Sequence, residues 1–366
     1  MSEQTNGRLE QGLSVLRDDV KSMHAYAVQD ATGMVKLDAM ENPYALSPGL
    51  QQALGQRLGQ VAVNRYPGSR IDDLKTALAA YVDMPAGMSL MLGNGSDELI
   101  GLLAMACVGG KATILAPEPG FVMYGLSAKL QGLAYVGVAL TADFELDVPA
   151  MVSAMALHQP AVVYLANPNN PTANAWRETD LDAVIDAAPG LVVVDEAYQP
   201  FANSTWLDRM RQQPQRYAHV VLMRTLSKFG LAGIRLGYML GPRDLVAQLD
   251  KLRPPYNVSV LNAECALFAL EHESVFAEQA ANIRGERERL LAELATMPDV
   301  EAFPSQANMV LVRVNDAATT FLALKTAGVL VKNVSTMHAL LHNCLRLTVG
   351  TPAENDQLLN ALKASV

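Results

Sequence analysis

Residues 220–238 read VVLMRTLSKFGLAGIRLGY, and this stretch decides the fold. Its first four residues are apolar without alternation, as in a strand that is buried on both faces of a parallel sheet. Lys228 follows just beyond this strand, with the hydroxyl groups of Thr225 and Ser227 and the guanidinium of Arg235 near it in sequence. An amine that can bond to a carbonyl, beside hydroxyl and guanidinium donors, indicates a Schiff-base site with a phosphate clamp.

The cofactor that uses a lysine, hydroxyl groups and an arginine together is pyridoxal phosphate. The alternative is a solvated lysine after a strand, because Ser-x-Lys and Gly-x-Arg also occur by chance. The rest of the chain has to decide between these two interpretations.

The composition is that of a large, well-packed enzyme. The chain has 366 residues, half of them hydrophobic, and a net charge of −9 that disfavours binding to nucleic acid. Its longest apolar stretch, residues 99–108, is too short to span a bilayer, and no basic start precedes an apolar block. We therefore expect a cytoplasmic protein that acts on small molecules, without a nucleic-acid or membrane partner.

Neither the cysteines nor the histidines indicate a metal site. Cys107, Cys265 and Cys344 lie far apart in apolar settings, which favours reduced core residues over a disulfide. His338 and His342 are four residues apart but lack the glutamate of a His-Glu-x-x-His pattern. We expect no metal.

Short apolar runs alternate with helical patterns between about residues 85 and 240, as in βαβ units. Strands are expected at 89–92, 112–115, 134–138, 161–165, 191–194, 220–223 and 237–240. Polar motifs follow these strands at their C-terminal ends, where ligands bind in open α/β sheets. The pattern predicts a large α/β domain with a mostly parallel seven-stranded sheet.

The pattern changes after Pro254-Pro255. One long helix is expected over residues 262–297, with Arg284, Arg287 and Arg289 among glutamates on a solvated face.

Two apolar strands at 309–314 and 345–349, with a helix at 317–327 between them, indicate a smaller α+β domain. The expected organisation is an N-terminal arm at 1–45, a large domain at 46–255 and a small domain at 256–366.

Three motifs after strands offer chemistry. Residues 93–99, GNGSDEL, place glycines before a helix start that can bind phosphate, although Glu98 occupies the third glycine position of a dinucleotide fingerprint. Residues 167–172, NPNNPT, form a stiff loop whose Asn170 can project its amide into a site, or only a turn. Asp195 ends a buried strand, where a carboxylate requires a cation such as a protonated pyridine, and Tyr198 lies three residues on.

Together and in this order, these motifs resemble the fold-type I pyridoxal-phosphate aminotransferases, and more narrowly the histidinol-phosphate aminotransferase family, over residues 26–351. Asn-Pro-x-Asn-Pro-Thr and Ser-Lys…Gly-x-Arg-x-Gly are shared by many relatives. The narrower motifs are ENPY at 41–44, RYP at 65–67, GSDE at 95–98, VDEAY at 194–198, PYNV at 255–258 and LRLTVG at 345–350.

The resemblance implies a role for each catalytic group. Lys228 holds the cofactor and, once released by the substrate, moves the proton between the substrate Cα and the cofactor C4′. Asp195 keeps the ring nitrogen protonated, so that the ring acts as an electron sink. Asn170 and Tyr198 bind the ring hydroxyl oxygen.

The resemblance also implies how the cofactor is held. Phe121 stacks on the ring, and Tyr66 reaches the cofactor phosphate of the neighbouring subunit, so the active form is expected to be a homodimer. The expected phosphate ligands are backbone amides around Ser96, Asp97 and Glu98, with Thr225, Ser227 and Arg235.

The same pocket is expected to accept histidinol phosphate and then glutamate, and Arg346 can pair with the anionic groups of both. Tyr26, Asn42, Tyr256 and Asn308 resemble family positions near the substrate. Three residues depart from the family: Ala173 replaces a usual glycine, Phe121 a commoner tyrosine, and Lys332 a frequent arginine.

The resulting hypothesis is reversible transamination in histidine biosynthesis, from L-histidinol phosphate and 2-oxoglutarate to 3-(imidazol-4-yl)-2-oxopropyl phosphate and L-glutamate. Close alternatives are an aromatic amino-acid aminotransferase or a decarboxylase of a phosphorylated amino acid on the same scaffold. From other classes, a nucleotide-binding oxidoreductase that uses residues 93–98 would leave Lys228, Asp195 and Asn170 unexplained, and a non-catalytic regulatory module would need a DNA-binding segment, of which the sequence shows no sign.

Overall fold

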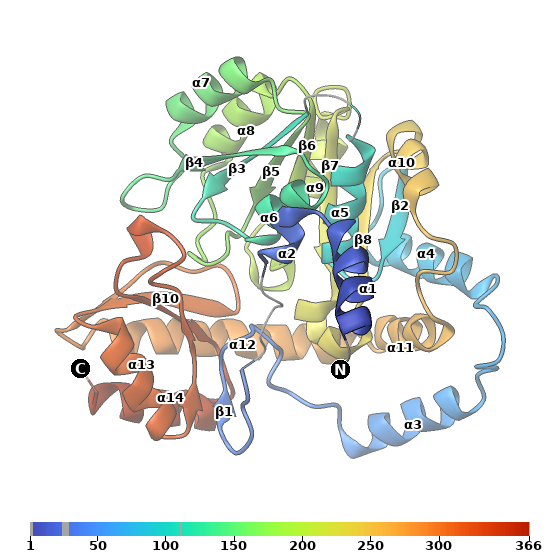
Figure 1. The fold of residues 1–366 in the computed structure, drawn as a ribbon. Helices are drawn as coiled ribbons and strands as arrows, with labels where there is room; N and C mark the ends of the chain where they lie inside the picture. The colour runs from blue at the N-terminus through green and yellow to red at the C-terminus, as the bar shows by residue number, and fades with distance from the viewer. Residues whose placement is uncertain (1–2, 24–28, 108, 110–111, 366) are drawn as a thin grey trace. The chain divides into compact units, whose positions relative to one another are not determined.

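The structure is a computed structural model that describes residues 3–23, 29–107, 109 and 112–365 (Figure 1). The chain divides into two units, Met1–Thr32 and Gly33–Val366. The first unit holds helices α1 (Glu3–Ser14) and α2 (Asp18–Lys21). The helices and strands from β1 (Val35–Lys36) onward belong to the second unit.

The second unit is built around a seven-stranded sheet. Its strands, in spatial order, are β2 (Met88–Gly93), β8 (Gly237–Pro242), β7 (Val220–Thr225), β6 (Leu191–Asp195), β5 (Val162–Ala166), β3 (Thr113–Glu118) and β4 (Ala134–Ala139). Strand β8 runs antiparallel to β2 and β7, and the other neighbouring pairs are parallel. The predicted mostly parallel sheet is confirmed, and a strand lies at each of the seven expected places.

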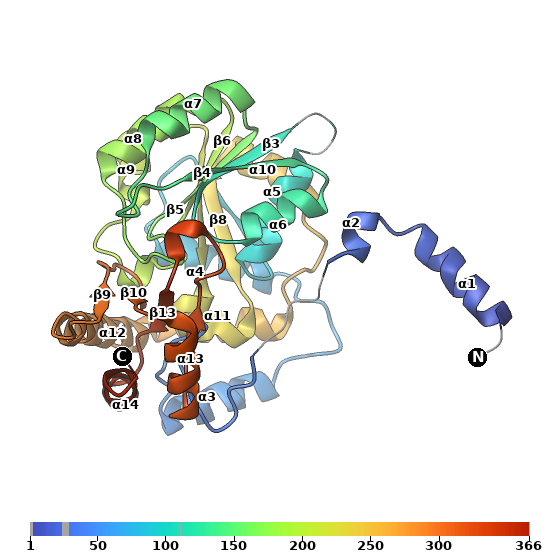
Figure 2. The same cartoon turned by 60° about the vertical axis from the view of Figure 1, so that its left-hand side comes forward.

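Helices cover both faces of this sheet, which is why its strands are apolar throughout. In β5, Val163 and Leu165 belong to one core cluster, whereas Val162 and Tyr164 belong to the cluster on the opposite face. The first face carries α4 (Arg70–Tyr81), α7 (Val148–His158), α8 (Glu178–Ala187) and α9 (Trp206–Gln212), and the second carries α5 (Ser96–Ala106), α6 (Met123–Leu130) and α10 (Arg243–Leu249) (Figure 2).

A second sheet follows in the C-terminal part. Its strands are antiparallel and lie in the order β12 (Lys332–Asn333), β13 (Cys344–Thr348), β10 (Met309–Val314) and β9 (Val300–Ala302). Helices α12 (Glu273–Leu294), α13 (Ala317–Thr326) and α14 (Pro352–Lys363) pack in the same core cluster. The two strands and the helix predicted here are present, while the domain limits at 45 and 255 stay predictions.

Smaller elements complete the unit. They are β1 (Val35–Lys36), which pairs in parallel with β11 (Val329–Leu330), helix α3 (Pro48–Gly59), helix α11 (Val260–Glu271), and the helical turns η1 (Gln199–Phe201), η2 (Ser227–Leu231), η3 (Ala232–Ile234), η4 (Asp250–Leu252) and η5 (Ala339–Leu341).

The prediction of one helix over 262–297 was wrong, because the chain forms two helices, α11 and α12, that meet at His272. The prediction that Arg287 is solvated was also wrong. Its side chain is buried and donates hydrogen bonds to the backbone oxygens of Phe201 and Ala307. Its Nε and Nη2 also donate to Glu288 Oε1 at 3.0 and 2.9 Å, so burial of this charge is tolerated because two carbonyl oxygens and a carboxylate satisfy the guanidinium.

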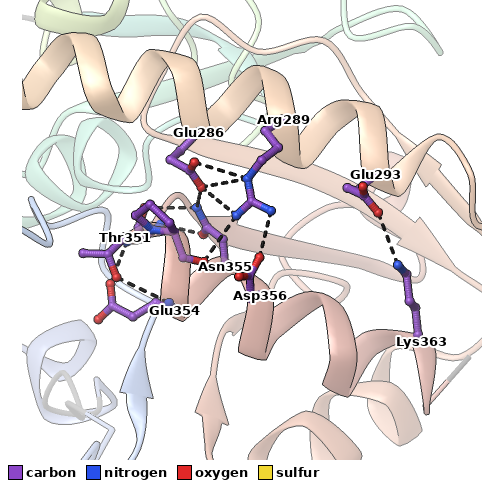
Figure 3. A network of polar contacts seen from close by, with 10 residues as sticks. Glu286, Arg289, Glu293, Thr351, Glu354, Asn355, Asp356 and Lys363 are labelled. Carbon is purple, nitrogen blue, oxygen red and sulfur yellow. Dashed lines mark hydrogen bonds and ion pairs between the residues drawn. The ribbon is translucent and has the colours of Figure 1, made fainter.

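Polar contacts connect α12 with α14 (Figure 3). Arg289 pairs with Glu286 on its own helix and with Asp356 of α14, each at 2.8 Å. At the start of α14, the Thr351 side chain accepts a hydrogen bond from the Glu354 N–H, and the Glu354 carboxylate accepts one from the Thr351 N–H. This capping box determines where α14 begins.

A buried ion pair holds the ends of β6 and β7 together. The Arg224 guanidinium donates to Glu196 Oε2 from Nε at 3.0 Å and from Nη2 at 2.9 Å, and both side chains are almost fully buried. Glu196 also accepts a hydrogen bond from the Thr205 hydroxyl at 2.9 Å. Because Glu196 follows Asp195 and Arg224 precedes Thr225, this pair positions the two strand ends that carry predicted site residues.

Replacement of Glu196 by alanine should lower the free energy of unfolding by about 3 to 5 kcal/mol, because it leaves the Arg224 charge buried without its partner. The control is Glu301→Ala, which breaks an exposed pair with Arg313 and should cost less than about 1 kcal/mol. Urea denaturation of both variants measures the difference. Equal losses in the two variants would show that the buried pair has no special weight.

Candidate active site

A cavity lies at the C-terminal ends of β5, β6 and β7. Asp195, the last residue of β6, is in register with Ala166, the last residue of β5, so both strands end at the same level. The lining residues are Met40, Ser96, Asp97, Phe121, Tyr124, Ala166, Pro168, Asn170, Asp195, Ala197, Tyr198, Thr225, Ser227, Lys228 and Arg235. The parallel order of these strands therefore brings together the segments that follow them, which carry Asn170, Asp195 and Lys228.

One end of the cavity can bind an anion. Helix α5 begins there at Ser96, so its first backbone N–H groups have no partner within the helix. Arg235 donates to the Ser227 hydroxyl at 3.3 Å and contacts the Asp97 carboxylate at 3.3 Å, and the Thr225 and Ser227 hydroxyls lie 3.0 Å apart. A guanidinium, two hydroxyls and a helix N-terminus form a donor set suited to phosphate.

Two glycines make this arrangement possible. A Cβ on Gly95 would lie 2.8 Å from Arg235 Nη2, and the φ of Gly95 is +82°. A Cβ on Gly237 would lie 2.7 Å from the Ser96 backbone nitrogen. The absence of side chains at both positions lets the guanidinium and β8 approach the start of α5 closely.

Lys228 lines the cavity and lies on the short helical turn η2 after β7. Its amine donates a hydrogen bond to the Ala39 carbonyl oxygen at 3.1 Å. Burial, assisted by the cations Arg346 and Arg235, lowers the pKa of Lys228 from 10.5 to about 8. The amine is therefore a much better nucleophile near neutral pH than an exposed lysine.

Asp195 also lines the cavity and is buried. Its Oδ1 accepts a hydrogen bond from the Ala197 N–H at 3.0 Å, and its Oδ2 accepts one from the Tyr124 hydroxyl at 2.7 Å. Burial raises the pKa of Asp195 to about 6, against the opposing effect of these two donors. A cationic ring nitrogen in the cavity would find an acceptor here.

Arg346 reaches the cavity through Asn170. It donates to Asn170 Oδ1 at 2.7 Å and to the Asp38 carbonyl oxygen at 2.8 Å. Because Arg346 uses the amide oxygen, the NH₂ group of Asn170 is the end that can serve as a donor to a ligand.

Of the predicted cofactor ligands, ten line the cavity and two do not. The ten are Ser96, Asp97, Phe121, Asn170, Asp195, Tyr198, Thr225, Ser227, Lys228 and Arg235. The Glu98 carboxylate instead accepts hydrogen bonds from the Asn94 N–H and the Asn257 amide, both at 2.6 Å, and so stabilises the loop before α5. Tyr66 is 75% exposed and stacks on Tyr256 at a centroid distance of 4.2 Å.

Of the predicted substrate residues that the structure describes, none lines this cavity directly, and Arg346 contacts it through Asn170. Asn42 donates to Gln279 Oε1 at 2.9 Å, and the buried Asn308 donates to the Met40 carbonyl oxygen at 2.9 Å. Both contacts hold the segment that carries Met40 and Ala39 beside Lys228. Tyr256 is 55% exposed, and Tyr26 lies outside the described residues.

Tyr124 and Met40 also line the cavity, although neither was predicted as a site residue. Tyr124 follows Phe121 by three residues, a helical spacing that could have indicated a common face at the start of α6. Met40 carried no signal, because its place depends on long-range contacts.

Ala173 occupies a position where its φ is +67°. This left-handed conformation explains why glycine is usual there in the family, and it costs an alanine about 1 to 2 kcal/mol.

Residues 32–362 match the family described as aminotransferase class I and II. A histidinol-phosphate aminotransferase from an Acidovorax species is 64% identical over 358 residues, which covers 97% of both chains. A histidinol-phosphate aminotransferase from Paracidovorax citrulli is 64% identical over 362 residues, covering 97% of this chain and 98% of the other. The crystal structure of histidinol-phosphate aminotransferase from Sinorhizobium meliloti in complex with pyridoxal-5'-phosphate superposes with a TM-score of 0.83 at 25% identity, covering 96% of this chain and 97% of that one.

Lys228 should react with pyridoxal phosphate at a rate that rises with pH and reaches half its maximum near pH 8, because its pKa is lowered and the neutral amine predominates above this pH. Stopped-flow absorbance of the cofactor-free protein, with Nα-acetyl-lysine as the reference, measures the profile. In Arg346→Gln the half-maximum should move to higher pH, because a cation that lowers the pKa is gone. A half-maximum near 10.5 in the unchanged protein would contradict the prediction.

Proposed function

Since the chain belongs to the class I and II aminotransferases, and within them to the histidinol-phosphate aminotransferases, we propose that it interconverts L-histidinol phosphate and 2-oxoglutarate with 3-(imidazol-4-yl)-2-oxopropyl phosphate and L-glutamate. This is a transamination of histidine biosynthesis that depends on pyridoxal phosphate. The observation that carries the proposal is the position of Lys228 in one cavity with a phosphate-binding end and a buried carboxylate.

The residues of the cavity fit pyridoxal phosphate. The cradle between Gly95, Gly237 and Arg235, which a Cβ would fill, suits the phosphate, and Asp195 suits the ring nitrogen. Phe121 offers a ring face for stacking. When bound, the cofactor supplies a sink for the electrons that are released as the substrate Cα loses its proton.

Lys228 has two tasks in this proposal. Its amine would hold the cofactor covalently in the resting enzyme, and once free it would carry a proton between the substrate Cα and the cofactor C4′. The lowered pKa suits the second task, because a base with a pKa of about 8 accepts and releases a proton near neutral pH.

Asn170 and Tyr198 would hold the ring hydroxyl oxygen, and Asp195 would keep the ring nitrogen protonated. The side chains of Asn170 and Tyr198 line the cavity beside Asp195, which supports these roles. Arg346 would pair with the phosphate of histidinol phosphate and then with a carboxylate of glutamate, since its fork suits both anions. Tyr26, Asn42, Tyr256 and Asn308 stay candidates for substrate contacts.

We place the enzyme in the cytoplasm as a homodimer. No helix among the described residues is long and apolar enough to cross a membrane. Tyr66 and its stacking partner Tyr256 form an exposed aromatic pair, with Val63 also exposed at 69%, and such a group is typical of an interface. In this arrangement the Tyr66 hydroxyl would donate a hydrogen bond to the phosphate of the cofactor bound by the neighbouring subunit.

Purified protein should show the absorbance band of covalently bound cofactor, and L-histidinol phosphate should convert this band to that of pyridoxamine phosphate far more readily than phenylalanine does. The reason is that the phosphate of histidinol phosphate offers the Arg346 guanidinium more negative charge and more acceptor oxygens than the carboxylate of phenylalanine does. An equal or better response to phenylalanine would move the enzyme to aromatic transamination. Lys228→Ala should lack the band, and a Lys228→Ala variant with full turnover would exclude the proposal.

A mixture of two inactive variants tests the shared site. Tyr66→Ala and Lys228→Ala chains, unfolded and refolded together, should recover up to about one quarter of the wild-type rate, because half of the dimers are mixed and each holds one intact site. Refolded single variants are the control. No recovery above either variant alone, despite formation of mixed dimers in native mass spectrometry, would show that Tyr66 acts within its own subunit.

A further inference from the structure

Tyr124 contacts Asp195, the carboxylate that would face the cofactor ring nitrogen. It lies near the start of α6, is 2% exposed, and donates a hydrogen bond from its hydroxyl to Asp195 Oδ2 at 2.7 Å. The carboxylate that faces the cofactor ring nitrogen is therefore held by a side chain from a different layer of the fold.

The phenol of Tyr124 is fixed in place by two other rings. It stacks on Tyr164 of β5 at a centroid distance of 4.2 Å and an interplanar angle of 10°. It also packs edge-to-face against Phe121, with the ring centroids 5.6 Å apart and the ring planes at 84°. Because Phe121 lines the cavity where the cofactor ring would stack, Tyr124 contacts both residues that would define the ring's plane and its nitrogen.

Each oxygen of Asp195 has one donor, Ala197 N–H on Oδ1 and Tyr124 on Oδ2. The Ala197 N–H belongs to the backbone and does not depend on the side chain at that position. The second donor, by contrast, is present only because residue 124 is a tyrosine. The negative charges of Asp97 and Glu196 raise the pKa of Asp195, because they disfavour another carboxylate nearby. The other titratable groups that face Asp195 are Tyr164, Tyr198 and Lys228.

We infer that Tyr124 is a positioning residue of the transamination, which holds the Asp195 carboxylate ionised and aimed at the ring nitrogen of the cofactor. The inference rests on the proposed function. Loss of the hydroxyl leaves one carboxylate oxygen buried without its donor, so proton uptake by Asp195 becomes easier. The ring nitrogen then loses its anionic partner at a higher pH than in the wild type.

The test is the pH dependence of pyridoxal phosphate binding to cofactor-free protein, followed by quenching of intrinsic fluorescence. In the wild type the dissociation constant should rise as the pH falls through about 6, the pKa of Asp195. In Tyr124→Phe, which keeps the stacked ring, this rise should begin about one pH unit higher. If Tyr124→Phe does not fold, 3-fluorotyrosine at position 124 is a stronger donor and should shift the rise to lower pH.

Two controls separate a positioning role from a structural one. Tyr164→Phe removes the other phenol of the stacked pair, for which the described part of the chain holds no hydrogen-bond partner, and should leave the profile unchanged. An analogue of pyridoxal phosphate with C–H in place of the ring nitrogen should show no difference between wild type and Tyr124→Phe.

The outcomes distinguish this inference from the function on which it rests. If the wild type binds pyridoxal phosphate but Tyr124→Phe has the same pH profile, or shifts equally with the nitrogen-free analogue, the role of Tyr124 is overturned while the proposed function stands. If the wild type binds no pyridoxal phosphate, both fail.

Discussion

The buried pair between Glu196 and Arg224 is the contact on which the site depends. It joins the C-terminal ends of β6 and β7 through two hydrogen bonds to one carboxylate oxygen, and both side chains are almost fully buried. The next residues along the chain on the cavity side are Asp195 and Thr225. Because an unpaired charge at this depth is costly, the pair specifies one arrangement of the two strand ends, and with it the distance between the anion-binding end and the carboxylate.

The pKa values of Lys228 and Asp195 are both shifted from their ordinary values. Burial lowers the pKa of Lys228 and raises that of Asp195, in each case because a buried group resists its charged form. Nearby cations assist the first shift, and the Tyr124 and Ala197 donors limit the second. A bound cofactor with a protonated ring nitrogen would stabilise the Asp195 carboxylate, so the site is suited to hold that cation.

The C-terminal part contributes through Arg346 of β13, which donates to Asn170 in the loop after β5 and to the Asp38 carbonyl. Asn308 and Asn42 hold the adjoining segment by further hydrogen bonds. The cavity is therefore lined by residues of the seven-stranded sheet and its loops together with Met40, and Arg346 of β13 contacts the lining residue Asn170. Substrate anions would bind where these meet, at a guanidinium whose orientation is already determined by amide and carbonyl acceptors.

By itself the sequence determined the sheet and most of the side chains that line the cavity, because strand-end motifs are local and parallel strands necessarily bring their C-terminal ends to one edge. Lys228, Asp195 and Asn170 were brought together in this way. Tertiary structure alone decided the contacts between distant segments: the burial of Arg287, the break at His272, the turn of Glu98 toward Asn257, and the Tyr124 hydroxyl on Asp195. Such contacts leave no periodic signal, since each depends on which helix packs on which strand rather than on neighbours along the chain.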